Sequence, residues 1–213
     1  MIGVIDYEAG NTLSVIKALE YLGENVLLTN DPDRLLECDH IVFPGVGAYY
    51  DAMERLRSYD LVDTIKKAID SKIPFLGICL GMQLLFDSSE ETIGVSDQNV
   101  KEVEGLGILR GRIMRFPEKE GFKIPQIGWN SVSIRDKDSR LFAGIPDNSY
   151  FYFVHSYYLI ADNEEDVAAR TDYIKLFDSA VEKNNIFGCQ FHPEKSGETG
   201  LKLLKNFCRI SAR

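Results

Sequence analysis

The sequence predicts an α/β fold in which a mostly parallel sheet carries helices on both of its faces. The main observation is that short apolar runs alternate with longer stretches of helical periodicity through the first third of the chain. Parallel strands need long crossover connections, so this alternation indicates right-handed strand–helix–strand units. The expected strands are 2–6, 25–29, 40–45 and 73–78, and the expected helices are 12–23, 31–37 and 49–71.

Local signals support two of the expected helices. In the 12–23 segment, Leu13, Ile16 and Leu19 recur at helical spacing, and Gly23 marks the end of the pattern. In the next segment, Asp31 and Pro32 suit the N-cap and the first position of a helix.

The second half of the chain has a different character. From about residue 106, strand-like segments follow one another without long helices, which predicts an antiparallel or mixed extension of the sheet. The stretch 186–196 is expected to be a strand that runs into a loop, 197–210 a closing helix, and the polar segment 88–103 a mobile loop. No repeat or composition break divides the chain, so we expect residues 1–213 to form a single domain.

Composition argues against several classes of protein. The chain has a net charge of −9, and its longest basic run is Lys66-Lys67, so we expect no nucleic-acid partner. No apolar run approaches the ~20 residues that a bilayer span needs. The N-terminal stretch does not resemble a signal peptide, so we expect a cytoplasmic protein without membrane contact.

The four cysteines give no sign of a metal site or a disulfide framework. Cys38, Cys79, Cys189 and Cys208 are widely scattered and show no metal-ligand spacing with the three histidines. We therefore expect reduced thiols, no metal and no cofactor.

Cys79 differs from the other cysteines because it lies in Gly77-Ile78-Cys79-Leu80-Gly81, directly after an apolar strand. This context matches the nucleophile elbow, G-x-(Ser/Cys)-x-G, in which the glycines make room for a sharp strand-to-helix turn. The turn would leave the main-chain N–H of Leu80 free for a developing oxyanion. The alternative is a buried cysteine that acts as a small hydrophobic side chain, which is our interpretation of the other three.

A cysteine nucleophile needs a base, and only three histidines are available. His40 begins an apolar strand and is expected to be structural, whereas for His155, inside another strand, a core role and a chemical role both stay open. His192 ends a strand, and Glu194 follows two residues later. A carboxylate there can fix the imidazole tautomer and stabilise the imidazolium. The predicted catalytic triad is therefore Cys79, His192 and Glu194.

Together these motifs resemble the class I, triad-type glutamine amidotransferase family. GICLGMQ at 77–83 and QFHPEKS at 190–196 occur in the order and separation typical of that family. DYEAGN at 6–11, PGVG at 44–47 and GWN at 128–130 resemble the members that supply ammonia to histidine biosynthesis. The resemblance covers essentially the whole chain and implies a flavodoxin-like fold.

The resemblance also implies a reaction. Cys79 would attack the side-chain amide of glutamine, while His192, oriented by Glu194, would carry a proton to the departing ammonia. A γ-glutamyl thioester would form, and water would release glutamate from it. The main-chain N–H groups of Leu80 and Val46 would form the oxyanion hole, that of Val46 after reorienting. The implied contacts to the α-groups of glutamine are Gly47, Gln83, Ser156 and Tyr157.

By the same resemblance, ammonia would pass to a (β/α)₈-barrel cyclase that forms a heterodimer with this chain. The implied interface residues are Asn11, Trp129, Tyr152 and Lys195. Structural alternatives stay open for three of them: Asn11 near a helix N-cap, Trp129 as a core anchor and Lys195 as a solvated charge. Because the chain contains nothing that resembles a synthase domain, we expect a separate acceptor protein that also gates the glutaminase.

Three other functions stay open from the sequence. The same chemistry could serve a sugar amidotransferase, a flavodoxin-like domain could keep Cys79 as a redox or regulatory cysteine, and the triad could belong to a cysteine peptidase. The complete set of Cys79, His192 and Glu194 counts against the second of these, because a sensor needs neither a general base nor a residue to orient it.

Overall fold

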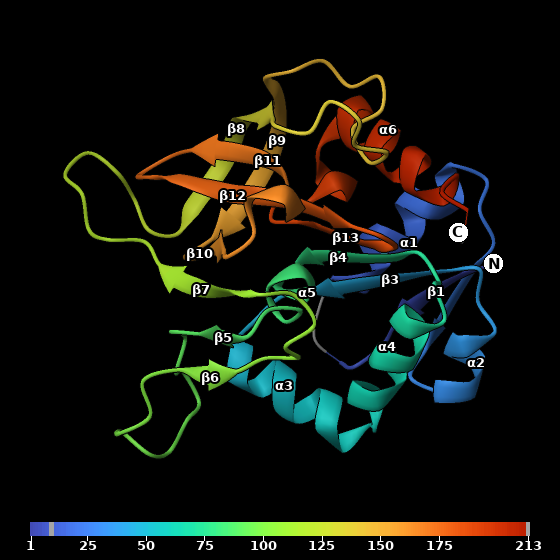
Figure 1. Cartoon of the computed structure of the whole chain (residues 1–213), viewed down its shortest axis with the longest axis horizontal. Coiled ribbons are helices and arrows are strands. Elements are labelled where there is room, and N and C mark those ends of the chain that lie inside the picture. Colours follow the sequence, from blue (N-terminus) through green and yellow to red (C-terminus); the bar gives the residue numbers. More distant parts are fainter. Residues whose placement is uncertain (9–10, 212–213) are drawn as a thin grey trace.

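The computed structural model describes residues 1–8 and 11–211. Ala9 and Gly10, which belong to the DYEAGN stretch, and Ala212 and Arg213 lie outside the described residues. The described chain is built on one large sheet, with helices on both of its sides (Figure 1). No helix in 1–8 or 11–211 combines the length and the apolar character needed to cross a membrane.

One half of the sheet is parallel and forms the centre of the fold. Its strands follow the order β2-β1-β3-β4-β13, and every neighbouring pair is parallel. β1, β4 and β13 are buried along their whole length, as expected for strands covered on both faces. The bounds are β1 Ile2–Ile5, β2 Val26–Thr29, β3 His40–Gly45, β4 Phe75–Cys79 and β13 Ile186–Cys189.

Two groups of helices cover the parallel strands (Figure 1). Apolar side chains of α1 and α6, among them Leu19 and Phe207, pack in one core on one side of the sheet. Those of α2, α3 and α4, among them Leu35, Leu56 and Ile65, pack in a second core on the other side. The bounds are α1 Thr12–Tyr21, α2 Pro32–Leu36, α3 Tyr49–Ser58, α4 Leu61–Asp70 and α6 Gly197–Cys208.

The other half of the sheet is mixed. β12 pairs antiparallel with β13, and the order continues through β10, β7, β5 and β6, while β11, β8 and β9 extend from β12 as a separate branch. The bounds are β5 Ser88–Ser89, β6 Val103–Glu104, β7 Gly111–Arg115, β8 Gln126–Ile134, β9 Ser149–His155, β10 Tyr157–Ala161, β11 Val167–Asp172 and β12 Leu176–Lys183. Three one-turn helices complete the fold: α5 Leu80–Gln83, η1 Glu164–Asp166 and η2 Pro193–Lys195.

This architecture confirms the expected fold class, with two local corrections. The helix expected over 49–71 is two helices, α3 and α4, because the chain turns at Tyr59 and Asp60, and Asp60 has a φ of 55°. Aspartate tolerates this left-handed conformation better than most residues, which makes the break possible. The helix that follows the predicted elbow is a single turn, α5. The sulfur of Cys79 therefore does not lie at the N-terminus of a long helix, whose dipole would favour its anion.

The expected loop 88–103 is bounded at both ends by paired strands. Ser88 and Ser89 of β5 pair antiparallel with Glu104 and Val103 of β6. The mobility of the segment between them stays a prediction.

The parallel register decides where the site forms. In β3 and β4, Gly45 pairs with Cys79, and in β13 and β4, Cys189 pairs with Ile78. The chain that leaves β13 therefore emerges beside Cys79, at the carboxyl edge of the parallel strands. Side chains that follow parallel strands meet at this edge, which is where open α/β sheets bind ligands.

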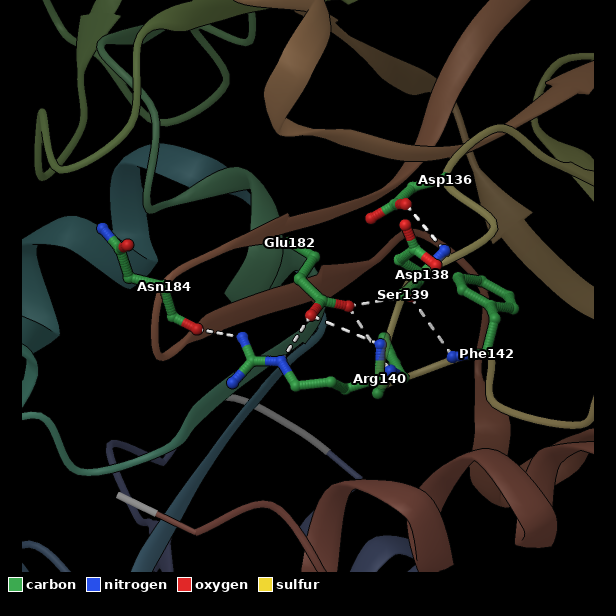
Figure 2. A network of polar contacts seen from close by, with 8 residues as sticks. Asp136, Asp138, Ser139, Arg140, Phe142, Glu182 and Asn184 are labelled. Atoms are coloured by element: carbon green, nitrogen blue, oxygen red, sulfur yellow. Dashed lines mark hydrogen bonds and ion pairs between the residues drawn. The ribbon is translucent and has the colours of Figure 1, made fainter. Parts of the chain in front are cut away.

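A polar network joins the β12–β13 turn to the β8–β9 connection (Figure 2). Arg140 donates through Nε to Glu182 at 2.7 Å and also donates to the main-chain oxygen of Asn184. Ser139 donates to the second carboxylate oxygen of Glu182 at 2.7 Å. The Glu182 side chain is only 8% exposed and that of Arg140 26%, so the carboxylate depends on these donors in place of water.

We predict that Arg140→Met lowers the free energy of unfolding by about 2–3 kcal/mol, because it leaves a buried carboxylate short of its cationic partner. Urea unfolding followed by circular dichroism measures the loss. The control is Arg112→Met, which breaks an exposed ion pair to Glu102 and should cost less than about 1 kcal/mol. Equal losses in the two variants would contradict this account of the network.

Candidate active site

Cys79 sits at a strained turn between β4 and α5. Its φ of 55° and ψ of −113° lie in a region that side chains rarely adopt, and it is the N-cap of the one-turn helix. The flanking glycines make this turn possible. A Cβ at Gly77 would lie 2.7 Å from the Cα of Met82, and a Cβ at Gly81 would overlap the main-chain oxygen of Phe43. The G-x-C-x-G pattern is therefore a steric requirement of the elbow.

The structure brings His192 and Glu194 together directly after β13. His192 Nδ1 lies 2.8 Å from Glu194 Oε1, and the two side chains are 3% and 1% exposed. Nε2 of His192 is buried without a hydrogen-bond partner among the described residues. The ring is thus held at one nitrogen and free at the other, which is the arrangement that a proton-transfer base needs.

Cys79 and Glu194 set the charge of His192. Burial by itself lowers the pKa of the imidazole, but the Cys79 sulfur and the Glu194 carboxylate outweigh it and raise the pKa to about 10. His192 therefore carries a proton at neutral pH and faces the sulfur as an imidazolium. The contact lacks full hydrogen-bond geometry in the resting structure, which is common for catalytic pairs before the substrate binds.

A cavity of about 600 Å³ opens in front of the sulfur. His192 and Glu194 do not line it. The cavity contains the predicted nucleophile together with every predicted oxyanion and substrate residue: Val46, Gly47, Cys79, Leu80, Gln83, Ser156 and Tyr157. These residues come from three segments that are far apart in the sequence, so it is the fold that brings them together.

The amide of Gln83 is already engaged within the protein. Its Nε2 donates to the main-chain oxygen of Tyr157 at 3.0 Å and to Gln190 Oε1 at 2.8 Å. Gln83 can therefore offer only its oxygen to a ligand. The same Tyr157 oxygen lies 2.7 Å from Nδ1 of His155, so any contact of Tyr157 to a ligand must use other atoms.

His155 is a neutral structural residue at the wall of the cavity. Burial lowers its pKa to about 4, and its two ring nitrogens contact the Tyr157 oxygen and the side-chain amide of Gln126. These contacts fix the connection from β9 to β10, in which Ser156 lies. Of the two roles left open for His155, the geometry favours the structural one.

Three polar residues of the site were missed by sequence reasoning. Glu91 and Arg115 line the cavity, and Gln190 contacts the Cys79 sulfur. Glu91 is 8% exposed and accepts a hydrogen bond from the main-chain N–H of Tyr49, and burial raises its pKa. Neither Glu91 nor Arg115 belongs to a local motif. Gln190 stands inside the QFHPEKS stretch, where its place two residues before His192 was the available signal.

The four predicted interface residues lie on elements that contact one another. α1, which follows Asn11, packs against η2, which contains Lys195, and η2 also packs against β9. Trp129 of β8 stands opposite Tyr152 of β9, with ring centroids 6.1 Å apart. Trp129 is 54% exposed, so it is not a core anchor. Asn11 accepts a hydrogen bond from the Ser14 hydroxyl but does not cap α1 through its side chain.

The remaining histidine and cysteines have structural environments. His40 contacts the main-chain oxygen of Ile210 through Nε2 at 2.7 Å. Burial raises the pKa of Cys38, Cys189 and Cys208, which makes these thiols poor nucleophiles. Within 1–8 and 11–211, no group of three or more histidine, cysteine or acidic side chains is arranged to hold a metal ion.

Comparisons with known proteins agree with this site. The family model for glutamine amidotransferase class-I matches residues 3–210. The chain is 50% identical over 210 residues to the imidazole glycerol phosphate synthase subunit HisH of Methanocaldococcus jannaschii, covering 99% of this chain and 100% of that protein. It is 47% identical over 216 residues to the HisH subunit of Methylococcus capsulatus, covering 98% and 95%. The chain therefore belongs to the class I glutamine amidotransferase family.

Solved structures show the same fold at low sequence identity. The structure of PurLQS from Thermotoga maritima superposes with a TM-score of 0.69 at 19% identity, covering 97% of this chain and 96% of that one. The glutaminase domain of Trypanosoma brucei CTPS with bound acivicin gives a TM-score of 0.67 at 19% identity, covering 99% and 94%.

We predict that His192 and His155 titrate very differently in NMR spectra of protein labelled with ¹⁵N-histidine. His192 should stay protonated at neutral pH and lose its proton only near pH 10, whereas His155 should stay neutral down to about pH 4. Glu194→Gln and Cys79→Ala should each move the titration of His192 to lower pH, because each removes a negative neighbour. An unshifted His192 titration near pH 6.5 in the unmodified chain would contradict the assigned charges.

Proposed function

We propose that this chain is the glutaminase subunit of an imidazole glycerol phosphate synthase. It hydrolyses glutamine to glutamate and ammonia, and a partner cyclase uses the ammonia to make imidazole glycerol phosphate and AICAR in histidine biosynthesis. One observation carries the proposal. Cys79, in its strained conformation, lines the cavity, and the hydrogen-bonded pair His192–Glu194 lies beside its sulfur. Relatives of nearly the same length at 47–50% identity, named as HisH subunits, support the choice of pathway.

The reaction begins with His192 already protonated. The Cys79 sulfur attacks the side-chain amide carbon of glutamine, and a C–S bond forms. The oxyanion that develops is stabilised by the main-chain N–H groups of Leu80 and Val46. His192, protonated before attack, gives its proton to the nitrogen as the C–N bond breaks, and ammonia departs. Glu194 holds the imidazole through Nδ1 during this transfer.

The second half of the reaction returns the enzyme to its starting state. His192, now neutral, accepts a proton from water while the water oxygen attacks the γ-glutamyl thioester. The C–S bond breaks, glutamate leaves, and Cys79 and His192 are again paired charges.

The cavity supplies partners for the charged α-groups of glutamine. The α-ammonium needs acceptors, which Glu91 and the free oxygen of Gln83 provide. Gly47, with a φ of 103° and no side chain, lets the ligand approach the main chain closely. Ser156 and Tyr157 also line the cavity, and any contact from Tyr157 uses groups other than its main-chain oxygen. A buried carboxylate is costly to leave without a cationic partner, so Glu91 favours a substrate that carries an α-ammonium.

An apolar strip on β8 and β9 is the surface proposed for the barrel cyclase. Ile127, Trp129 and Tyr150 are 63%, 54% and 60% exposed, although the opposite face of the same strands packs Phe151 and Phe153 into the core. Such a cluster of exposed aromatic and aliphatic side chains is typical of a partner interface.

The strip is connected to the catalytic histidine through main-chain hydrogen bonds. The N–H of His192 donates to the oxygen of Tyr152 at 2.9 Å, and the N–H of Tyr152 donates to the hydroxyl of Ser196, which in turn donates to the oxygen of His192. A partner that moves Tyr152 thus acts on His192 directly, which gives the expected gating a physical route.

The proposal is tested first by Cys79→Ala. We predict a loss of glutamine hydrolysis of at least ~10⁴-fold, because the nucleophile is removed, while the cyclase still binds. Glutamate release and calorimetric titration with the cyclase measure the two properties. Hydrolysis of glutamine by the variant at the rate of the unmodified chain would show that Cys79 is not the nucleophile.

A second prediction concerns the strip. Trp129→Ala should weaken binding of the cyclase at least about tenfold, because exposed tryptophans of this kind are typical interface hot spots. Hydrolysis by the isolated chain should not change, whereas the stimulation by the cyclase should require more cyclase. The control is Leu28→Ala, which truncates an exposed apolar side chain on β2 at the far edge of the sheet. If Leu28→Ala weakens binding and Trp129→Ala does not, the interface lies elsewhere.

A further inference from the structure

The side-chain amide of Gln190 lies directly beside the Cys79 sulfur. β13 runs parallel to β4 with Cys189 opposite Ile78, so the next residues in register are Gln190 and Cys79. Gln190 has no exposed surface, and its Nε2 lies 3.6 Å from Cys79 Sγ, within hydrogen-bonding distance for the large sulfur atom. The amide is therefore built into the site, on the side of the sulfur that is closed to solvent.

The direction of this hydrogen bond is fixed by the neighbours of Gln190. The main-chain oxygen of Tyr157 can only accept, so the group of Gln83 that faces it must be its NH₂. That NH₂ also faces Gln190, which must present its oxygen, and the two lie 2.8 Å apart. The NH₂ of Gln190 is then left to point at Cys79. A flip of either amide would set two donors or two acceptors against each other.

A donor at this position favours the anionic form of the sulfur. Cys79 is only 7% exposed, so water contributes little to the stability of a thiolate. The main-chain oxygen of Val154, 3.9 Å from the sulfur, can accept from a thiol but repels a thiolate. The N–H of Gln190 stabilises the thiolate more than the thiol, because a hydrogen bond to a charged acceptor is stronger than one to a neutral acceptor.

We propose that Gln190 is an additional catalytic group, whose N–H holds the Cys79 sulfur in its reactive direction and stabilises its anion. The amide chain Tyr157–Gln83–Gln190 fixes this donor and joins the glutamine pocket, through Gln83, to the nucleophile. The proposal rests on the proposed function only in taking Cys79 as the nucleophile.

The test is the rate at which iodoacetamide alkylates Cys79, measured by mass spectrometry of the Cys79 peptide at fixed pH without glutamine. Gln190→Met has a similar volume but no N–H donor, and we expect about a tenfold to hundredfold slower alkylation than in the unmodified chain. In the complex with the cyclase, kcat for glutamine should fall by a similar factor, and KM should change less than kcat.

Two further variants separate this effect from a loss of stability. Gln190→Asn keeps the amide but is one methylene shorter, so it cannot reach both Gln83 and Cys79. Its alkylation should slow by a similar factor, and this variant provides the test if Gln190→Met does not fold. Ser179→Ala removes a buried hydroxyl that accepts from Thr171 on the neighbouring strand, and it should lower the urea midpoint without slowing alkylation.

Alkylation at the unmodified rate in a folded Gln190→Met or Gln190→Asn variant would overturn the proposal. Slow alkylation of Cys79 in the Ser179→Ala variant would also overturn the proposal, because lower stability alone would then account for the slower alkylation. Failure of the glutaminase function would appear separately, as glutamine hydrolysis that survives Cys79→Ala, because the alkylation rate is measured without substrate.

Discussion

The strained main chain at Cys79 is the constraint on which the rest of the site depends. Its positive φ turns the sulfur out of the sheet, and this turn exists only because Gly77 and Gly81 leave room for the backbone to fold back. β3 and β13 hold Cys79 from both sides through the parallel register. The cost of the unusual conformation is offset by the surrounding sheet, and the benefit is a nucleophile placed at the mouth of a cavity.

The electrostatics of the site follow from burial. An imidazole as buried as that of His192 would ordinarily lose its proton. His155 at the end of β9 is neutral for that reason. His192 differs because it lies between a sulfur and a carboxylate, whose combined effect exceeds that of burial. Two histidines in similarly dry surroundings therefore have opposite charge states, and only the one with anionic neighbours is equipped to move a proton.

The antiparallel branch carries the surface proposed for the cyclase. β8 and β9 present aromatic side chains on both of their faces, and the core can cover only one of them. The uncovered face begins near the cavity, since the main chain of Val154 contacts the Cys79 sulfur and that of Tyr152 contacts His192. A protein bound at this face would lie next to the place where ammonia is released, which suits a subunit whose product is used elsewhere.

The sequence by itself determined the strands and helices of the parallel half, the glycine-flanked cysteine and the pair His192–Glu194, because these depend on local periodicity, turn sterics and a separation of two residues. It did not reveal the break at Asp60, since two short helices and one long helix have the same apolar spacing. The tertiary structure alone brought Glu91 and Arg115 to the cavity, placed Gln190 beside the Cys79 sulfur and exposed Trp129 beside Tyr152. These placements arise from strand register and from which face of a strand the core covers, and both are decided only when distant segments pair.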